Sequence, residues 1–141
     1  MTDYTHPVLL IEDNPIDLDL AVRAFSRCNI LNPIQTARDG VEAVGYIDKW
    51  TTGEELPVVI LLDLKLPRLD GLEVLNRMKH SAISANVPVI VLTSSTNSGD
   101  IKKAYELGAN SYLIKPLEYE QFIDLVGMID QYWIKNNRCP G

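Results

Sequence analysis

Acidic residues stand directly after two apolar runs of this sequence. Glu12 and Asp13 follow the run 8–11, and Asp63 follows the run 58–62. Runs of this kind are typical of strands that are buried on both faces within a parallel sheet. In open α/β sheets, ligands bind just outside the carboxyl ends of the strands. We therefore expect the three carboxylates to meet at one edge of a sheet.

A hydroxyl group and an ammonium group hold the corresponding places after two later runs. Thr93 follows the run 87–92, and Lys115 follows the run 111–114. Carboxylates that lie close together repel each other unless a cation intervenes, and carboxylate oxygens suit Mg²⁺. Lys115 could reach a phosphate, to which Thr93 could donate a hydrogen bond. The pattern predicts transfer of a phosphoryl group to Asp63 with Mg²⁺, for which Mn²⁺ or Ca²⁺ could substitute.

Strand-like and helix-like segments alternate along the 141 residues, and these elements must position the site. We expect strands at about 8–12, 34–37, 58–63, 87–93 and 111–114, and helices at about 15–28, 40–50, 71–80, 98–107 and 117–135. Such alternation is typical of βαβ units. The predicted fold class is α/β: a single doubly wound, flavodoxin-like (βα)5 domain whose five-stranded parallel sheet has the order 2-1-3-4-5. Its core would span about 7–135 and leave no room for an output domain.

Composition narrows the classes of function. The chain is 46% hydrophobic and 23% charged, with a net charge of −6, so it lacks the basic patch that a nucleic-acid surface needs. Its apolar stretches are too short to cross a membrane, and 1–4 do not begin a signal peptide. Cys28 and Cys139 are expected to be free thiols. These features predict a cytoplasmic protein that binds neither nucleic acid nor membrane.

Several motifs occur together and in order: 11–13, 62–67, 70–71, 93–95 and 108–116. In this combination the chain resembles a response-regulator receiver domain over essentially its full length. The resemblance implies a two-component signalling protein, not an enzyme beyond self-phosphotransfer and autodephosphorylation. The motif 12–17 and the loops near 32–33 and Gly53 most resemble the small stand-alone regulators that are paired with cyanobacterial and bacterial phytochromes.

The resemblance also implies a role for each residue of the acidic site. Asp63 would accept the phosphoryl group from a sensor histidine kinase, of the phytochrome type in this group, or from a histidine phosphotransfer protein. Asp13 and Asp63 would bind Mg²⁺ directly, Glu12 through a water, and Lys65 through its backbone carbonyl. Lys65 stands where many receivers carry Asn or another polar residue. The lifetime of the phosphoryl group therefore stays open.

A switch is implied in the same way. Thr93 and Lys115 would contact the phosphoryl oxygens, and Tyr112 would change rotamer when Thr93 moves. The peptide bond between Lys115 and Pro116 would be cis. The surface formed by 98–107, 111–114 and 117–135 would then change shape, and a partner protein would bind it.

The last predicted helix carries more apolar residues than one core stripe needs. Five of them could face the sheet at helical spacing: Phe122, Ile123, Val126, Ile129 and Trp133. Leu125, Met128 and Tyr132 would then lie on another face. Because exposed apolar patches tend to mark interfaces, we expect a homodimer through the fourth helix, the fifth strand and the fifth helix. A deep groove that covers these residues is the alternative.

Plainer interpretations compete with this scheme. Singly, Asp63 could cap a loop, Lys115 could be a surface lysine and Tyr112 could be a packed aromatic. A haloacid-dehalogenase-type phosphatase would need an Asp in place of Lys65. The hydroxyl-rich loop 93–99 suggests a flavodoxin-type FMN electron carrier, which would be yellow. The remaining alternative is a receiver scaffold that cannot be phosphorylated.

Overall fold

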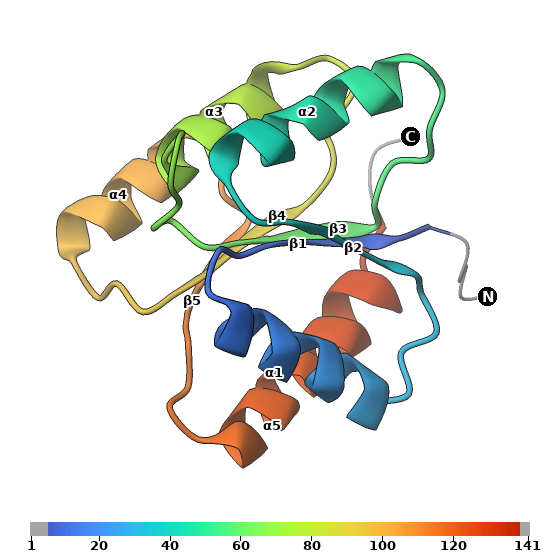
Figure 1. Ribbon diagram of the computed structural model, residues 1–141, viewed down its shortest axis with the longest axis vertical. Helices are drawn as coiled ribbons and strands as arrows, with labels where there is room; N and C mark the ends of the chain where they lie inside the picture. The colour runs from blue at the N-terminus through green and yellow to red at the C-terminus, as the bar shows by residue number, and fades with distance from the viewer. Residues whose placement is uncertain (1–5, 139–141) are drawn as a thin grey trace.

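Five parallel strands form the centre of the protein, for which a computed structural model describes residues 6–138 (Figure 1). Residues 1–5 and Cys139 lie outside the described residues. The strand order is β2-β1-β3-β4-β5, so the predicted fold and order are confirmed. The strands are β1 (Val8–Ile11), β2 (Ile34–Ala37), β3 (Val59–Leu62), β4 (Val89–Thr93) and β5 (Ser111–Ile114).

Helices cover both faces of the sheet. On one face α1 packs beside α5, and on the other face α2, α3 and α4 lie in sequence (Figure 1). Each face buries its own apolar cluster against the strands. The helices are α1 (Pro15–Arg27), α2 (Gly40–Thr51), α3 (Gly71–His80), α4 (Ser98–Glu106) and α5 (Tyr119–Ile129), which continues into the π-helical segment η1 (Asp130–Ile134). None of the helices in the described part of the chain has the length and apolar character that crossing a bilayer requires.

Two glycines permit the close packing of the loop that follows β3. A Cβ atom on Gly71 would lie 2.4 Å from the Cα of Leu64 and 2.5 Å from the carbonyl oxygen of Asp63. A Cβ atom on Gly40 would lie 1.9 Å from the carbonyl oxygen of Leu69. Side chains at either position would push α3 or α2 away from this loop. The two glycines therefore hold the segment after Asp63 against the helices.

The prediction for the last helix was wrong in its geometry. The segment expected to be one α-helix over 117–135 is α5 followed by η1, in which the N–H of Lys135 donates to the carbonyl of Asp130 at 3.0 Å. The wider turn changes which residues face the core, because a π turn holds more residues than an α turn. Ile134 is buried, and Trp133 is half-buried but still packs against the core cluster, as expected.

The predicted surface stripe on α5 was also partly wrong. Met128 and Tyr132 are exposed as expected, but Leu125 is half-buried and packs against the apolar cluster on the α1 side of the sheet. Ile123, expected in the core, is half-buried and packs against the same cluster. The exposed apolar surface of this helix is thus smaller than the sequence indicated.

Cys28 is a free thiol, as expected.

Candidate functional site

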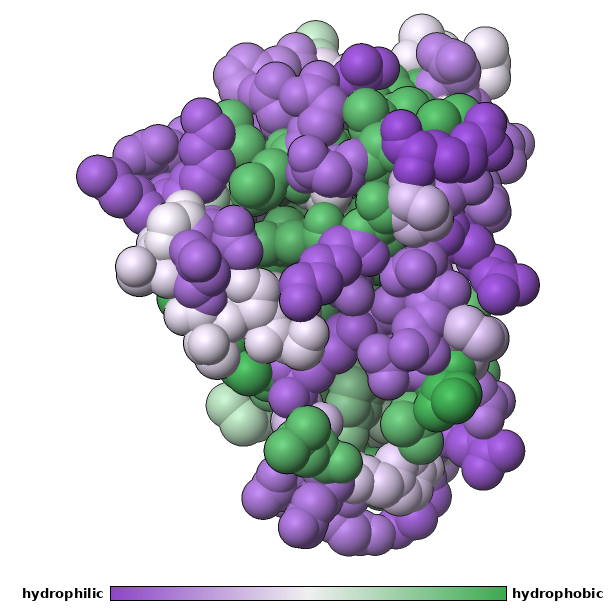
Figure 2. Space-filling model, turned by 60° about the vertical axis from the view of Figure 1, so that its left-hand side comes forward, coloured by the Kyte–Doolittle hydropathy of each residue, from purple (hydrophilic) through white to green (hydrophobic). Residues whose placement is uncertain are grey.

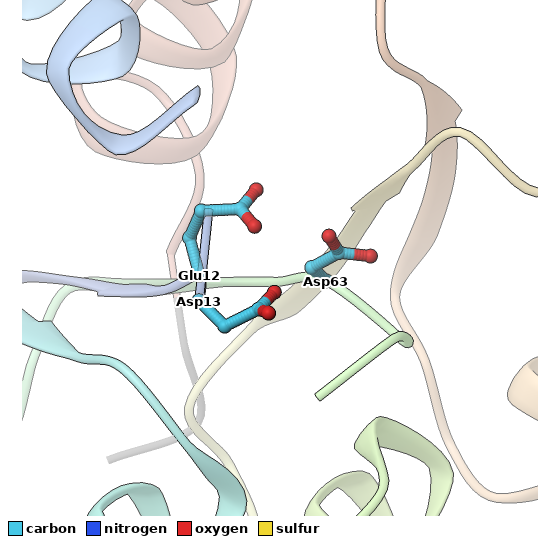
Figure 3. A group of neighbouring side chains, drawn as sticks. All are labelled: Glu12, Asp13 and Asp63. Atoms are coloured by element: carbon cyan, nitrogen blue, oxygen red, sulfur yellow. The ribbon is translucent and has the colours of Figure 1, made fainter. Parts of the chain in front are cut away.

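Three carboxylates meet at the carboxyl edge of the sheet, as the sequence predicted. Glu12, Asp13 and Asp63 each place an oxygen within 4.8 Å of the others. Glu12 and Asp13 extend from the end of β1 towards Asp63 at the end of β3 (Figure 3). The two strands are neighbours in register, with Ile11 opposite Leu62. The parallel pairing therefore brings together acids that lie 50 residues apart in sequence.

Asp63 is held through both of its carboxylate oxygens. Its Oδ1 accepts hydrogen bonds from the hydroxyl of Thr93 at 2.8 Å and from the backbone N–H of Lys65 at 3.2 Å. Its Oδ2 accepts from the ammonium of Lys115 at 2.9 Å. Burial of Asp63 alone would raise its pKa, but the hydrogen bonds from Lys115, Thr93 and Lys65 outweigh burial and lower the pKa. The side chain is therefore held as an ionised, oriented carboxylate.

Lys115 reaches this pocket from the end of β5. Its Nζ lies 2.9 Å from Asp17 Oδ2 and 2.9 Å from Asp63 Oδ2, and it also forms an ion pair with Glu12. Burial would lower the pKa of the ammonium, but hydrogen bonds to Glu12, Asp63 and Asp17 raise it. Lys115 therefore holds its positive charge beside the Asp63 carboxylate.

The prediction of a cis bond before Pro116 was wrong. None of the peptide bonds among residues 6–138 is cis. The trans form is also the one that an X–Pro bond prefers, by roughly 0.5–1 kcal/mol. The backbone N–H of Lys115 donates to the carbonyl of Thr93 at 2.9 Å, and this bond ties the end of β5 to β4.

Sequence analysis missed Asp17 as a residue of the site. The side chain of Asn14 caps α1 and accepts hydrogen bonds from the N–H groups of Ile16 at 2.9 Å and Asp17 at 3.3 Å. An acid in the first turn of a helix is favoured by the helix dipole alone, so Asp17 carried no separate signal of function. Only the Asn14 cap gave an indirect hint. Because it places the start of α1 at the site, the first turn, including Asp17, faces the strand ends.

Glu12 shows that the pocket favours an additional cation. Burial raises the pKa of Glu12 to about 7, although the hydrogen bond from Lys115 opposes this shift. The charge of Asp63 contributes to the raised pKa as well. Lys115 is the one ammonium shared by the carboxylates of Glu12, Asp17 and Asp63, so negative charges outnumber it here, and a hard divalent cation on carboxylate oxygens would offset the excess. The donor set of Glu12, Asp13 and Asp63 fits such an ion.

The site opens to solvent on one side. A cavity of about 550 Å³ lies beside Asp13 and Lys65, and Asp70 and Asp100 also line it. Lys65, which lines this cavity, also donates its backbone N–H to Asp63 Oδ1.

A chain of hydrogen bonds connects Asp63 to Tyr112 through Thr93 and Ser95. The N–H of Ser95 donates to the Thr93 hydroxyl at 3.4 Å, and the carbonyl of Ser95 accepts from the Tyr112 hydroxyl at 3.0 Å. The hydroxyl of Ser95 donates to Asp100 Oδ2 at 2.6 Å and so links the loop to α4. Thr93 is fully buried and Tyr112 is half-buried. Sequence analysis did not identify Asp100.

Comparison with known proteins agrees with this geometry. Residues 8–127 match the family model described as "Response regulator receiver domain". The chain belongs to this family. The receiver is 44% identical, over 95% of its own length and 87% of the relative's, to the probable methanogenesis regulatory protein FilR2 of Methanothrix harundinacea. It is 33% identical to response regulator Rcp1 of Synechocystis sp., with 99% of each chain covered.

Solved structures of relatives superpose closely on the receiver. The phosphorylated cyanobacterial phytochrome response regulator RcpA has a TM-score of 0.89 at 33% identity, with 97% of this chain and 99% of that chain covered. The Mn²⁺-bound form of Rcp1 has a TM-score of 0.86 at 32% identity, with 96% and 99% covered. The phosphatase and flavodoxin alternatives do not fit membership in this family, so the receiver is a signalling protein whose acidic site suits a divalent metal.

Proposed function

We propose that Asp63 is the phosphoacceptor, and that the phosphoryl group comes from a sensor histidine kinase or a histidine phosphotransfer protein. The observation that carries the proposal is the environment of the Asp63 carboxylate. One oxygen is bound by Thr93 and Lys65, and the other is bound by Lys115. Donors that already surround this carboxylate can turn to the oxygens of an incoming phosphoryl group and stabilise its charge.

Mg²⁺ is the proposed physiological ion, with Mn²⁺ or Ca²⁺ as substitutes. Asp13 and Asp63 would bind it directly, Glu12 through a water, and Lys65 through its backbone carbonyl. A bound cation would neutralise charge on the acids and on the phosphoryl oxygens. The fit of the three carboxylates supports this assignment, as does the Mn²⁺-bound structure of Rcp1.

Thr93 and Tyr112 are the proposed switch. A phosphoryl group on Asp63 adds negative charge beside the Thr93 hydroxyl, which would turn from the carboxylate to a phosphoryl oxygen. Through Ser95 this movement would reach Tyr112 and the start of α4. The surface of α4, β5 and α5 would then bind a partner protein. That the receiver is cytoplasmic stays a prediction.

Homodimerisation through the same surface is part of the proposal. Exposed apolar side chains occur on all three elements, with Tyr105 on α4, Ile114 on β5 and Met128 on α5. The face that carries α4 and β5 shows apolar patches separated by hydrophilic residues (Figure 2). Sedimentation at high concentration, with and without phosphorylation, tests this point. A monomer in both states would contradict it.

The input pathway has two candidates. The close match to the phytochrome response regulator RcpA supports a phytochrome-type kinase and a response to light. The higher identity to FilR2, a probable methanogenesis regulatory protein, favours a metabolic input instead. Phosphotransfer from each type of kinase to the receiver would distinguish them through the rate of labelling.

The phosphoacceptor assignment is tested with acetyl phosphate and a candidate kinase. Wild type should become labelled in the presence of Mg²⁺ and stay unlabelled when EDTA removes the metal. Asp63→Asn should stay unlabelled throughout. Asp19→Asn is the matched control, because Asp19 is exposed and pairs with Arg23 on the outside of α1. Labelling of Asp63→Asn equal to that of wild type would refute the assignment.

A further inference from the structure

The ammonium group of Lys115 is shared among three carboxylates. An ammonium has three N–H donors, and here its partners are Glu12, Asp17 and Asp63. The Lys115 side chain is 13% exposed, so water competes little for these donors. A phosphoryl oxygen can bind Lys115 when one of the three carboxylates gives up its bond.

Asp17 differs from the other two partners in where it lies. Asp63 carries the phosphoryl group itself, and Glu12 faces the proposed cation. Asp17 belongs to the first turn of α1, and the Asn14 cap that binds its backbone N–H does not depend on the acceptor. Phosphorylation of Asp63 therefore leaves the ion pair between Asp17 and Lys115 in place.

We propose that Asp17 is a positioning residue that competes with the phosphoryl group for Lys115 and so limits how fully Asp63 becomes phosphorylated. The inference rests on Asp63 being the acceptor. In the unphosphorylated protein, Asp17 helps to hold the ammonium in the pocket. In the phosphorylated protein, Asp17 withholds part of the same charge from the phosphoryl oxygens. The N-terminus of α1 is thereby coupled to the state of the site.

Asp17→Asn removes the negative charge of Asp17 but keeps the size and shape of its side chain. Asparagine keeps an acceptor oxygen for Lys115 but removes the negative charge, so the ammonium becomes more available to the phosphoryl group. The side chain of Asp17 is 34% exposed, and solvent screens part of its attraction. We expect affinity for beryllofluoride, a phosphoryl analogue, to rise about 1.5-fold to fivefold at saturating Mg²⁺. Beryllofluoride binds when an Asp63 oxygen displaces water from beryllium.

Labelling by acetyl phosphate should change in the same direction. An Asp63 oxygen attacks phosphorus, the bond between phosphorus and the acetyl oxygen breaks, and acetate leaves. The phosphorylated fraction at steady state, measured by intact mass, should be higher in Asp17→Asn than in wild type. Affinity for Mg²⁺ alone, measured by calorimetry, should fall about twofold or more, because the pocket loses one negative charge.

Opposite changes in the two affinities distinguish competition from structural damage. A loosened α1 would weaken binding of both Mg²⁺ and beryllofluoride, and that result would overturn the proposal. Asp19→Asn is the control, since it removes the same charge from the same helix without contact to Lys115. Beryllofluoride affinity of Asp17→Asn equal to that of Asp19→Asn would also overturn it. Asp63→Asn should bind no beryllofluoride. If wild type fails to bind the analogue as well, the acceptor assignment itself fails.

Discussion

The central strands and the edge strand β5 contribute to the same site but differ in burial. Every residue of β1, β3 and β4 is buried, whereas the residues of β5 are half-buried or exposed. The acids and Thr93 follow or end central strands, and Tyr112 and Lys115 belong to or follow β5. Asp63 and Thr93 therefore lie on the best-packed part of the sheet, whereas Tyr112 and Lys115 lie on its more exposed edge.

This difference suggests a division of labour. Each central strand has a neighbour on both sides, whereas β5 pairs with β4 alone. Local motions of low free-energy cost occur where few apolar contacts hold the chain. A phosphoryl group on Asp63 would thus move β5 and the loop before α4 more readily than it would move β1 or β3. The comparison predicts that mutations in the two regions have unequal effects on stability and on the response.

The largest expected effect contrasts two apolar strand residues. Leu62 of β3 is fully buried, and Ile114 of β5 is 43% exposed. Leu62→Ala should lower the free energy of unfolding by about 2–5 kcal/mol, because it leaves a cavity between the layers. Ile114→Ala should lower it by less than about 1 kcal/mol. Urea denaturation of both variants measures the difference, and equal losses would remove the distinction between centre and edge.

The second-largest expected effect concerns the charge of Glu12, which lies after the central strand β1. Burial raises the pKa of Glu12 to about 7, from an ordinary value of 4.5. Between these pH values the folded protein binds more protons than the unfolded chain. The free energy of unfolding of the metal-free protein should therefore fall as pH rises through this window, by on the order of 3 kcal/mol from Glu12.

Urea denaturation in EDTA at several pH values measures this dependence. Glu12→Gln should show a flatter profile than wild type between pH 4.5 and 7, because it cannot gain or lose the proton. Saturating Mg²⁺ should also flatten the wild-type profile, since a bound cation keeps Glu12 ionised. If the stability profiles of wild type and Glu12→Gln are parallel, protonation of Glu12 does not cause the pH dependence.

The same contrast explains which features could be predicted from sequence. Strands at 34–37 and 111–114 were predicted residue for residue, because turn residues and helical patterns bound them closely. The convergence of Glu12, Asp13 and Asp63 followed from parallel strands sharing one edge. Fold and acceptor pocket were thus accessible, since local pattern and one topological rule decide both.

Features that depend on tertiary fit were not accessible. The η1 segment arises where buried Asp130 pairs with Lys135 at 2.9 Å, and no local propensity indicates a π turn there. The contact of Asp17 with Lys115 joins residues 98 positions apart. Leu125 looked like a surface residue because the packing of α1 against α5 is not visible in the spacing of one helix.

The smallest expected effect compares the two edges of the sheet. The hydroxyl of Tyr112 donates to the carbonyl of Ser95 at 3.0 Å beside β5, and the hydroxyl of Tyr46 donates to the carbonyl of Thr36 at 3.0 Å beside β2. Either Tyr→Phe change removes one such bond and should cost about 0.5–1.5 kcal/mol of stability.

The two variants should differ in where the backbone loosens. Tyr112→Phe should speed amide hydrogen exchange over 94–98, because the loop before α4 loses its bond to β5. Tyr46→Phe should leave exchange in that loop unchanged. Both bonds have the same chemistry and the same length, so a different result reflects where in the molecule each bond lies. Faster exchange of the loop in both variants, or in neither, would mean that Tyr112 does not restrain the segment that connects the acceptor to α4.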